Sequence, residues 1–207
     1  MQKEKGKIRE YVESLLIAAL IAFFVRSFFI QAFKIPSSSM EPTLLIGDHL
    51  LVNRLSYVVK VPFTDKVIFY LGMPKKGDVI VFRYPLDRDK DFIKRVIGTE
   101  GDTVEIRNKV VYLNGRPLND QWGYYSDERI FPFYISPRDN MDKVTVPKGS
   151  FFVMGDNRDK SLDSRFWGFV KVDDLVGKAL IVYFSWDSNA RDILHYVRWS
   201  RIGMIIR

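Results

Sequence analysis

One long apolar run near the amino terminus constrains the fold more than any other feature of this chain. Residues 15–33 read LLIAALIAFFVRSFFIQAF and are interrupted only by Arg26, Ser27 and Gln31. As a helix, such a segment measures roughly 28 Å, which is close to the hydrocarbon thickness of a bilayer. Arg26 lies toward the far end, where its long side chain can reach the membrane interface. The run therefore predicts a transmembrane helix over residues 15–33.

Positive charge ahead of the run predicts its orientation. Four cations precede it, at Lys3, Lys5, Lys7 and Arg9. The cytoplasmic flanks of membrane helices are enriched in such cations. We therefore expect residues 1–14 to be cytoplasmic, residues 15–33 to cross the membrane, and residues 34–207 to form a domain on its outer side.

Two other interpretations of the run remain open. A buried helix of a soluble protein is one, although such helices are rarely apolar on all faces. A cleaved signal peptide is the other, because a basic start, an apolar run and small residues at Ser37 and Ser39 fit that pattern. Arg26 and Lys34 stand between the apolar run and any such cleavage site, which favours a retained anchor.

Beyond residue 34 the sequence predicts a mainly β domain. Short apolar runs alternate with turn signals, and long helical periodicity is missing. Asn114-Gly115 is a strong hairpin signal, and residues 92–97 form a strand candidate that ends at Gly98. From about residue 108 to residue 147 we expect a small peripheral insert, because much of this stretch is polar, aromatic-rich and irregular.

Composition excludes several chemistries and partners. The chain has no cysteine, so disulfides, thiol nucleophiles and thiolate metal sites are excluded. The net charge of +7 could attract nucleic acid, but no finger, helix-turn-helix or RNA-binding signature accompanies the dispersed basic residues. We therefore expect membrane lipids as the partner of this charge and no nucleic acid. No histidine or carboxylate cluster has metal-ligand spacing, and no glycine loop suits a phosphate, so we expect no metal and no cofactor.

Nucleophilic chemistry has two candidate bases for a serine. Histidine is the usual one, but only His49 and His195 are available and neither has an evident orienting motif. A lysine serves only if its pKa falls well below about 10.4. In a strand, Lys94 would share a face with Phe92 and Val96, whose apolar groups would disfavour the ammonium form. An ordinary strand lysine that reaches water is the alternative.

The serines after Pro36 are equally ambiguous when taken alone. A proline followed by serines usually marks a turn or a cap. Their position is more informative, because Ser39 follows the predicted anchor by only a few residues. We therefore expect Ser39 to lie at the membrane surface, where a hydrolase would act on bonds presented at the bilayer face.

Four segments, taken in order behind the apolar run, resemble the bacterial type I signal peptidases. They read PSSSMEPTL at residues 36–44, GDVIVFRYP at 77–85, FIKRVIG at 92–98 and GDNRDKSLDSRFWG at 155–168. The resemblance implies a signal-peptidase-like fold, a β-rich catalytic domain with a small inserted subdomain behind an N-terminal transmembrane helix. Ser38 stands where the family often has glycine and Phe92 where it often has tyrosine, but neither departure removes a reacting group.

The same resemblance implies roles for individual residues. Ser39 corresponds to the nucleophile and Lys94 to the general base. The Ser37 hydroxyl and the Ser39 backbone N–H correspond to the oxyanion hole. Ser161 matches a serine that orients the lysine. The supporting ion pair corresponds to Asp163 and Arg165. Shallow pockets for small substrate residues correspond to Ile35, Met40, Leu44, Phe92 and Ile93.

The implied activity is removal of N-terminal signal peptides from exported preproteins. Cleavage would follow small residues in A-x-A-like sites at the outer face of the bacterial cytoplasmic membrane, and the protein-export translocase is a candidate partner. A non-catalytic, membrane-tethered β-domain that binds secreted chains is the alternative from another functional class. A peptidase with one dedicated substrate is also open, whereas self-cleaving repressors would need a DNA-binding module that this chain lacks.

Overall fold

The computed structural model describes residues 2–61, 64, 66–188, 190 and 195–207, and within the first helix it describes side chains only for residues 6–23. The helices are α1 (Gln2–Phe28), α2 (Ser164–Trp167) and the short 3₁₀ helices η1 (Ser38–Met40), η2 (Arg54–Ser56), η3 (Arg158–Lys160), η4 (Val172–Asp174) and η6 (Trp199–Arg201). The strands are β1 (Ile30–Lys34), β2 (Asp48–Asn53), β3 (Val58–Lys60), β4 (Val67–Tyr70), β5 (Val79–Tyr84), β6 (Asp87–Gly98), β7 (Thr103–Arg107), β8 (Val110–Leu113), β9 (Arg116–Pro117), β10 (Met141–Thr145), β11 (Ser150–Met154), β12 (Val170–Lys171) and β13 (Leu175–Ser185).

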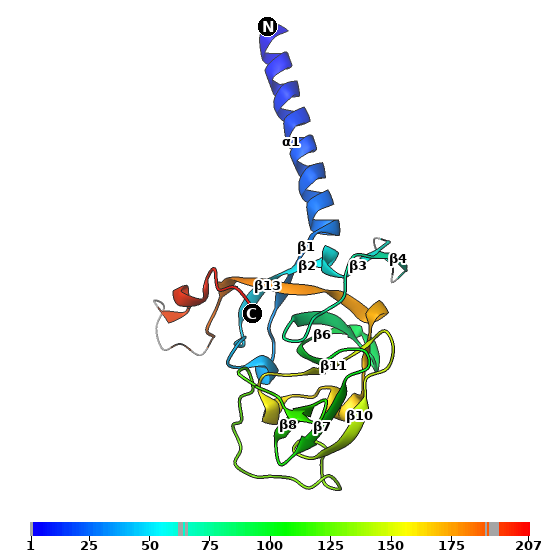
Figure 1. The fold of residues 1–207 in the computed structure, drawn as a ribbon. Coiled ribbons are helices and arrows are strands. Elements are labelled where there is room, and N and C mark those ends of the chain that lie inside the picture. Colours follow the sequence, from blue (N-terminus) through cyan, green and yellow to red (C-terminus); the bar gives the residue numbers. More distant parts are fainter. Residues whose placement is uncertain (1, 62–63, 65, 189, 191–194) are drawn as a thin grey trace.

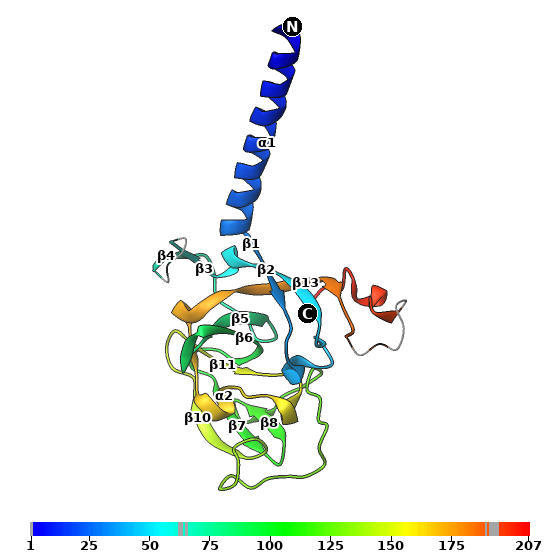
Figure 2. The same cartoon turned by 180° about the vertical axis from the view of Figure 1, so that it is seen from behind.

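The described strands form a mainly β domain, as predicted. A seven-stranded sheet has the order β1-β2-β13-β5-β6-β11-β12, and β10-β7-β8-β9 form a second sheet. Strands β3 and β4 pair separately as a hairpin near the base of α1 (Figure 1). The second sheet lies at the end of the molecule that is farthest from α1, which is also visible from behind (Figure 2).

Helix α1 projects away from the sheets, and its end corrects the predicted span of residues 15–33. The helix stops at Phe28, and Ile30–Lys34 form strand β1, which pairs antiparallel with β2 from Ile30 opposite Asn53 to Lys34 opposite His49. Pairing with β2 satisfies the β1 backbone and overrides the apolar pattern that favoured a continued helix. Among the described residues, no helix is both long enough and apolar enough to cross a membrane.

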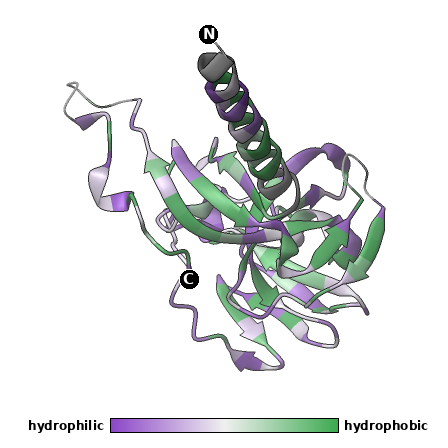
Figure 3. Cartoon of the chain, turned by 90° about the horizontal axis from the view of Figure 1, so that it is seen from above, coloured by the Kyte–Doolittle hydropathy of each residue, from purple (hydrophilic) through white to green (hydrophobic). Residues whose placement is uncertain are grey.

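Side chains of α1 divide by polarity along the helix. Polar residues gather toward its amino-terminal end and apolar residues toward the β domain (Figure 3). Every described side chain between residues 6 and 23 is exposed. Helix α1 therefore contributes nothing to the core of the domain through these side chains.

Strands β5 and β6 form the hairpin that carries the predicted lysine. The register places Ile80 opposite Lys94 and Val81 opposite Ile93. The strand predicted over residues 92–97 is the C-terminal part of β6. The predicted hairpin turn at Asn114-Gly115 is also present, and both residues have the positive φ, 53° and 78°, that such tight turns require.

The second sheet belongs to the region predicted as an insert. It begins at Thr103, ahead of the predicted boundary near residue 108, and its last strand ends at Thr145. The sheet packs against the main sheet through a cluster of buried apolar residues: Ile97, Val104, Ile106, Val111, Met141, Val146, Phe152 and Met154. Ile97 comes from β6 and Phe152 and Met154 from β11, so the insert shares its core with the strand that bears Lys94.

Another core cluster, called the first core cluster below, joins the segment between β1 and β2 with strands β2, β5 and β13 and with Ile206. It contains Ile35, Met40, Leu44, Leu50, Val52, Val79, Val81, Ala179, Val182 and Ile206. Met40 and Leu44 follow the predicted nucleophile by one and five positions and are fully buried. Burial of their side chains fixes the backbone on which Ser39 lies.

Truncation of this cluster should destabilise the domain. We expect Leu50→Ala to lower the free energy of unfolding by about 2–5 kcal/mol, because Leu50 is fully buried and its removal leaves a cavity. Leu86→Ala is the matched control, since that leucine is 72% exposed and should change stability by less than about 0.5 kcal/mol. Urea unfolding followed by fluorescence measures both, and equal effects would contradict this assignment of the core.

Candidate active site

Ser39 and Lys94 meet in the structure although 55 positions separate them. Ser39 lies on η1, between β1 and β2, and Lys94 lies on β6. The Lys94 Nζ atom is 2.8 Å from the Ser39 Oγ atom, and both side chains are buried. A hydroxyl and an amine at this distance can exchange a proton directly, which is the contact that a serine nucleophile requires from its base.

The surroundings of Lys94 favour its neutral form. Burial lowers the pKa of Lys94 to about 8, while the carboxylates of Asp163 and Asp156 oppose the shift and Arg165 adds to it. The Nζ atom also donates to the Ile93 carbonyl at 2.8 Å. Loss of hydration is therefore the main cause of the shift.

Apolar contact with Lys94 comes from its own strand. The Lys94 Nζ atom lies 5.3 Å from the centroid of the Phe92 ring. This agrees with the predicted sharing of one strand face by Phe92 and Lys94. Arg95 leaves the strand on the other face, as the alternation also predicts.

The Ser39 backbone is held by the segment that follows β11. The Asn157 N–H donates to the Ser39 carbonyl at 3.2 Å. Ser37 is exposed, and its Oγ atom lies 3.5 Å from the Ser39 Oγ atom. The Ser37 hydroxyl therefore lies beside the predicted nucleophilic oxygen, and its oxyanion role stays a prediction.

Asp163 and Arg165 form a buried ion pair beside the dyad. Arg165 donates from Nε and Nη2 to the two Asp163 carboxylate oxygens, each at 2.8 Å. The same carboxylate caps α2 through the Arg165 N–H and accepts from the Gly155 N–H at 3.0 Å. These partners hold the pKa of Asp163 below its ordinary value against the opposing effect of burial, so the carboxylate stays charged near Lys94.

Ser161 lies in the same segment and is 5% exposed. Its hydroxyl makes no hydrogen bond of ordinary geometry to any described residue, although it is near enough to Asp163 to help lower the pKa of that carboxyl. A direct bond from Ser161 to Lys94 is not present, and its predicted orienting role stays a prediction.

A second buried ion pair, between Arg95 and Asp156, was not among the predicted site residues. Arg95 Nε and Nη2 donate to the Asp156 carboxylate at 2.8 and 2.6 Å, and both side chains are completely buried. The Arg95 guanidinium also stacks on Trp122 at 4.6 Å. An arginine inside an apolar strand is the sequence signal that could have found it, because such a charge requires a buried partner. Its partner, 61 positions away, could not be identified from spacing.

Gly155 permits the close approach of two parts of the site. A Cβ atom at this position would lie 2.3 Å from the Ser39 carbonyl oxygen and 2.3 Å from the Ser161 hydroxyl oxygen. No side chain fits at that separation. Glycine at residue 155 therefore lets the backbone after β11 pack directly against the serine loop.

The residues predicted to form substrate pockets are divided between two clusters. Ile35, Met40 and Leu44 are buried in the first core cluster, and Ile93 packs against it. Phe92 packs against a second cluster, where it stacks on Tyr84 with centroids 4.3 Å apart. All five lie close to Ser39 or Lys94 in sequence, and their contact with substrate stays a prediction.

The histidine alternative has no support at Ser39, whose described side-chain partners are Lys94 and Ser37. His49 is a half-buried residue of β2 that packs edge-on against Tyr183 and Phe184, with centroids 5.9 and 5.7 Å away. Among the described residues, no group of three or more histidine or carboxylate side chains converges as a metal site.

The family model and the relatives that match this chain all belong to the same family, the signal peptidases. A family model described as signal peptidase, peptidase S26, matches residues 8–186. A signal peptidase I from Pseudomonas fluorescens is 36% identical over 95% of this chain and 78% of its own length. A probable signal peptidase I-1 from a Synechocystis strain is 37% identical over 95% of this chain and 87% of its own length. A solved signal peptidase I from Enterococcus faecalis is 33% identical, with 52% of this chain and 97% of its own chain covered and a TM-score of 0.41.

Loss of the close packing at Gly155 should destabilise the site. We expect Gly155→Ala to lower the free energy of unfolding by about 1–3 kcal/mol or more, because the new methyl group overlaps the Ser39 carbonyl. Gly6→Ala is the control, since Gly6 lies in α1 with open space around it and alanine favours a helix. A Gly155→Ala protein as stable as the control in urea unfolding would show that the packing is looser than described.

Proposed function

Because this chain belongs to the signal peptidase family, peptidase S26, and is a serine endopeptidase, we propose that it removes signal peptides from exported preproteins through a dyad of Ser39 and Lys94. The single observation that carries the assignment of the dyad is the 2.8 Å contact between the buried Lys94 amine and the Ser39 hydroxyl. A buried lysine without an ion-pair partner costs stability. That cost is expected where a neutral amine is needed as a base.

The reaction begins with proton transfer and acyl-enzyme formation. Neutral Lys94 takes the proton of the Ser39 hydroxyl while the Ser39 oxygen attacks the scissile carbonyl carbon. The tetrahedral intermediate collapses, the C–N bond breaks, and Lys94 returns the proton to the departing amine. The signal peptide is then held as an ester on Ser39, and the mature chain leaves with a free amino terminus.

Hydrolysis of the ester repeats the sequence with water. Neutral Lys94 takes a proton from a water molecule, whose oxygen attacks the ester carbonyl. Collapse of the second intermediate breaks the bond to the Ser39 oxygen, which recovers the proton from Lys94. The signal peptide leaves with a free carboxylate.

The negative oxygen of each intermediate needs hydrogen-bond donors. The Ser39 backbone N–H and the Ser37 hydroxyl are the proposed pair, and the 3.5 Å between the Ser37 hydroxyl oxygen and the nucleophilic Ser39 oxygen is consistent with a Ser37 hydroxyl beside the attacked carbonyl. An oxyanion donor of this kind typically contributes about 3–4 kcal/mol to stabilisation of the transition state.

We attribute the preference for small substrate residues before the cleaved bond to apolar side chains near the dyad, called the wall residues here. The five proposed wall residues are Ile35, Met40, Leu44, Phe92 and Ile93. Ile35, Met40 and Leu44 are buried, whereas Phe92 and Ile93 are partly exposed. Ser161 and the pair of Asp163 and Arg165 support Lys94 from the other side.

A non-catalytic binding domain is the competing function. Such a domain would bind secreted chains without needing the desolvated amine beside Ser39. Buried ionisable groups without an ion-pair partner are disfavoured, so the presence of such an amine beside Ser39 supports the enzyme.

Membrane attachment is proposed to involve helix α1. Its exposed apolar residues are Leu15, Leu16, Ile17, Leu20, Ile21 and Phe23. Water-exposed apolar residues in such number favour contact with lipid, and the cations of residues 3–9 favour anionic headgroups. Residues 34–207 are the proposed extracytoplasmic catalytic domain, residues 1–14 the cytoplasmic end, and the export translocase a proposed partner.

Replacement of the nucleophile should abolish cleavage. We expect Ser39→Ala to reduce kcat/KM for a synthetic Ala-X-Ala peptide by roughly 10⁴-fold or more, since residual catalysis from binding alone is small. Chromatography of the cleaved peptide measures this, with Ser136→Ala in the insert as the matched control at normal activity. Equal cleavage by wild type and Ser39→Ala would instead favour the binding domain, and full activity in Lys94→Ala would exclude Lys94 as the base.

Activity should depend on pH through Lys94. Only the neutral amine accepts the Ser39 proton, and the pKa of Lys94 is about 8. We therefore expect kcat/KM to rise about tenfold per pH unit below this value and to level off above it. Initial rates between pH 5 and 10, with folding checked by circular dichroism, would test this. An acid limb centred near pH 6.5 would point to a histidine instead.

Lipid attachment should depend on the apolar half of α1, which lies toward the β domain. We expect the double variant Leu16→Glu and Leu20→Glu to lose co-sedimentation with anionic phospholipid vesicles, because two carboxylates in an apolar contact are costly. Leu86→Glu is the control, since Leu86 is equally exposed but lies in the β5–β6 turn. Unchanged sedimentation of the double variant would contradict the proposal.

A further inference from the structure

The segment of residues 155–165 determines how the dyad is enclosed. Its Asn157 N–H holds the Ser39 carbonyl, and Gly155 packs against the same carbonyl. It also carries Ser161 and Asp163, which lie beside Lys94. A displacement of this segment by a fraction of an ångström therefore moves the walls of the site.

The insert contacts this segment first through its backbone. The Tyr124 N–H donates to the Asp156 carbonyl at 2.7 Å, and the Arg158 N–H donates to the Tyr124 carbonyl at 2.9 Å. Tyr124 and Asn157 thereby form a parallel bridge. The loop of the insert thus lies as a short added strand along the residues that hold Ser39.

A buried ion pair reinforces this contact. Arg158 is completely buried, and its Nη2 atom donates to the Asp120 carboxylate at 2.7 Å. The same guanidinium donates from Nε to the Gly155 carbonyl at 3.2 Å. Asp120 of the insert is therefore linked through one rigid side chain to the glycine that packs against Ser39.

A second ion pair holds the next residue of the segment. The Asp159 carboxylate is nearly inaccessible and accepts from Lys109 Nζ at 2.8 Å and from the Asp127 N–H at 2.8 Å. Arg165 donates to the Arg138 carbonyl at 2.8 Å. Lys109, Asp127 and Arg138 all belong to the insert, so Arg158 and Asp159 of η3 and the start of α2 are all held by it.

These contacts resist displacement because they are shielded from water. An ion pair in a low-dielectric interior is difficult to separate once formed, since either charge left alone loses its compensation. We propose that the insert is a positioning clamp for the active site, in which Asp120 and Lys109 hold residues 155–165 against the Ser39 loop through Arg158 and Asp159. The proposal deepens the proposed function and rests on it.

Loosening the clamp should change the chemistry of Lys94 as well as its geometry. Lys94 faces Asp156, Asp163 and Arg165 of the clamped segment, and burial is the main cause of its lowered pKa. A displaced segment admits water to the amine, and the pKa then moves back toward its ordinary value. Loss of folded protein alone would scale the rate equally at every pH and would leave the acid limb in place.

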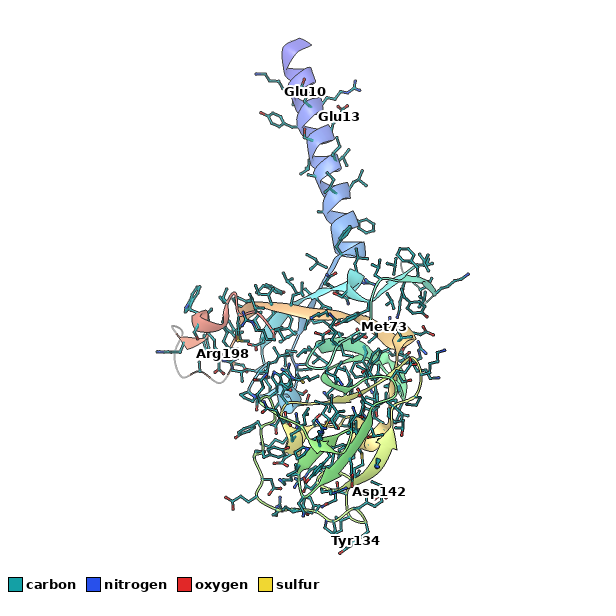
Figure 4. All side chains as sticks on the ribbon, in the orientation of Figure 1. Glu10, Glu13, Met73, Tyr134, Asp142 and Arg198 are labelled. Atoms are coloured by element: carbon teal, nitrogen blue, oxygen red, sulfur yellow. The ribbon has the colours of Figure 1, made fainter. Side chains whose placement is uncertain are left out.

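The test uses two clamp variants in the full chain. Asp120→Asn removes the charge that faces Arg158, and Lys109→Met removes the charge that faces Asp159 while retaining the bulk of the side chain. Asp142→Asn is the control, because Asp142 is an exposed residue of β10 in the same insert, at the end of the molecule far from α1 and near Tyr134 (Figure 4). For each protein, kcat, KM and the pH profile are measured with the Ala-X-Ala peptide, together with the urea midpoint.

We expect kcat to fall about ten- to a hundredfold in both clamp variants, as a misplaced catalytic group does, with little change in KM. The acid limb should move to higher pH, and Asp120→Glu should restore part of the rate. If Asp120→Asn does not fold, Lys109→Met decides the outcome. An unmoved acid limb in folded clamp variants with an active wild type would overturn the clamp alone. An inactive wild type, or an active Ser39→Ala protein, would overturn the proposed function instead.

Discussion

The enclosure of one amine by apolar side chains and backbone is the constraint on which the rest of this structure depends. Lys94 must lose most of its hydration to act as a base, yet two carboxylates nearby favour its charged form. Packing decides whether desolvation or the carboxylates dominate the pKa of Lys94, because desolvation acts only while water is excluded. The strand β6, the loop that carries Ser39 and the segment after β11 all contribute to that exclusion.

Each of the two carboxylates near Lys94 is compensated by an arginine. Asp163 and Asp156 each have an arginine of their own, Arg165 and Arg95, through bidentate contacts. These arginines neutralise the carboxylates that would otherwise hold Lys94 in its ammonium form. Lys94 and Arg95 are neighbours in sequence but leave the strand on opposite faces, so one strand supplies both the base and the cation that anchors the opposite loop.

Elements set by neighbouring residues could be predicted from the sequence, whereas elements and contacts that depend on distant residues could not. The β strand that contains Lys94 and the turn at Asn114-Gly115 follow from alternation and turn residues. The helix end at Phe28 could not be predicted, because the apolar pattern continues past it and only pairing with β2 converts the chain to a strand. The contact of Arg95 with Asp156 could not be predicted for a similar reason, since Asp156 lies 61 positions away in the loop after β11 and no sequence spacing indicates the pair.

The short connection between helix α1 and strand β1 limits the distance between the helix end and Ser39. Only Phe29 separates α1 from β1, and β1 is locked into the main sheet by its register with β2. Ser39 follows the helix end at Phe28 by eleven residues, a path that cannot exceed roughly 36–40 Å even when fully extended. The distance of the nucleophile from the helix end thus has a covalent upper limit, and a peptide bond held farther from the helix end than this limit would be out of reach.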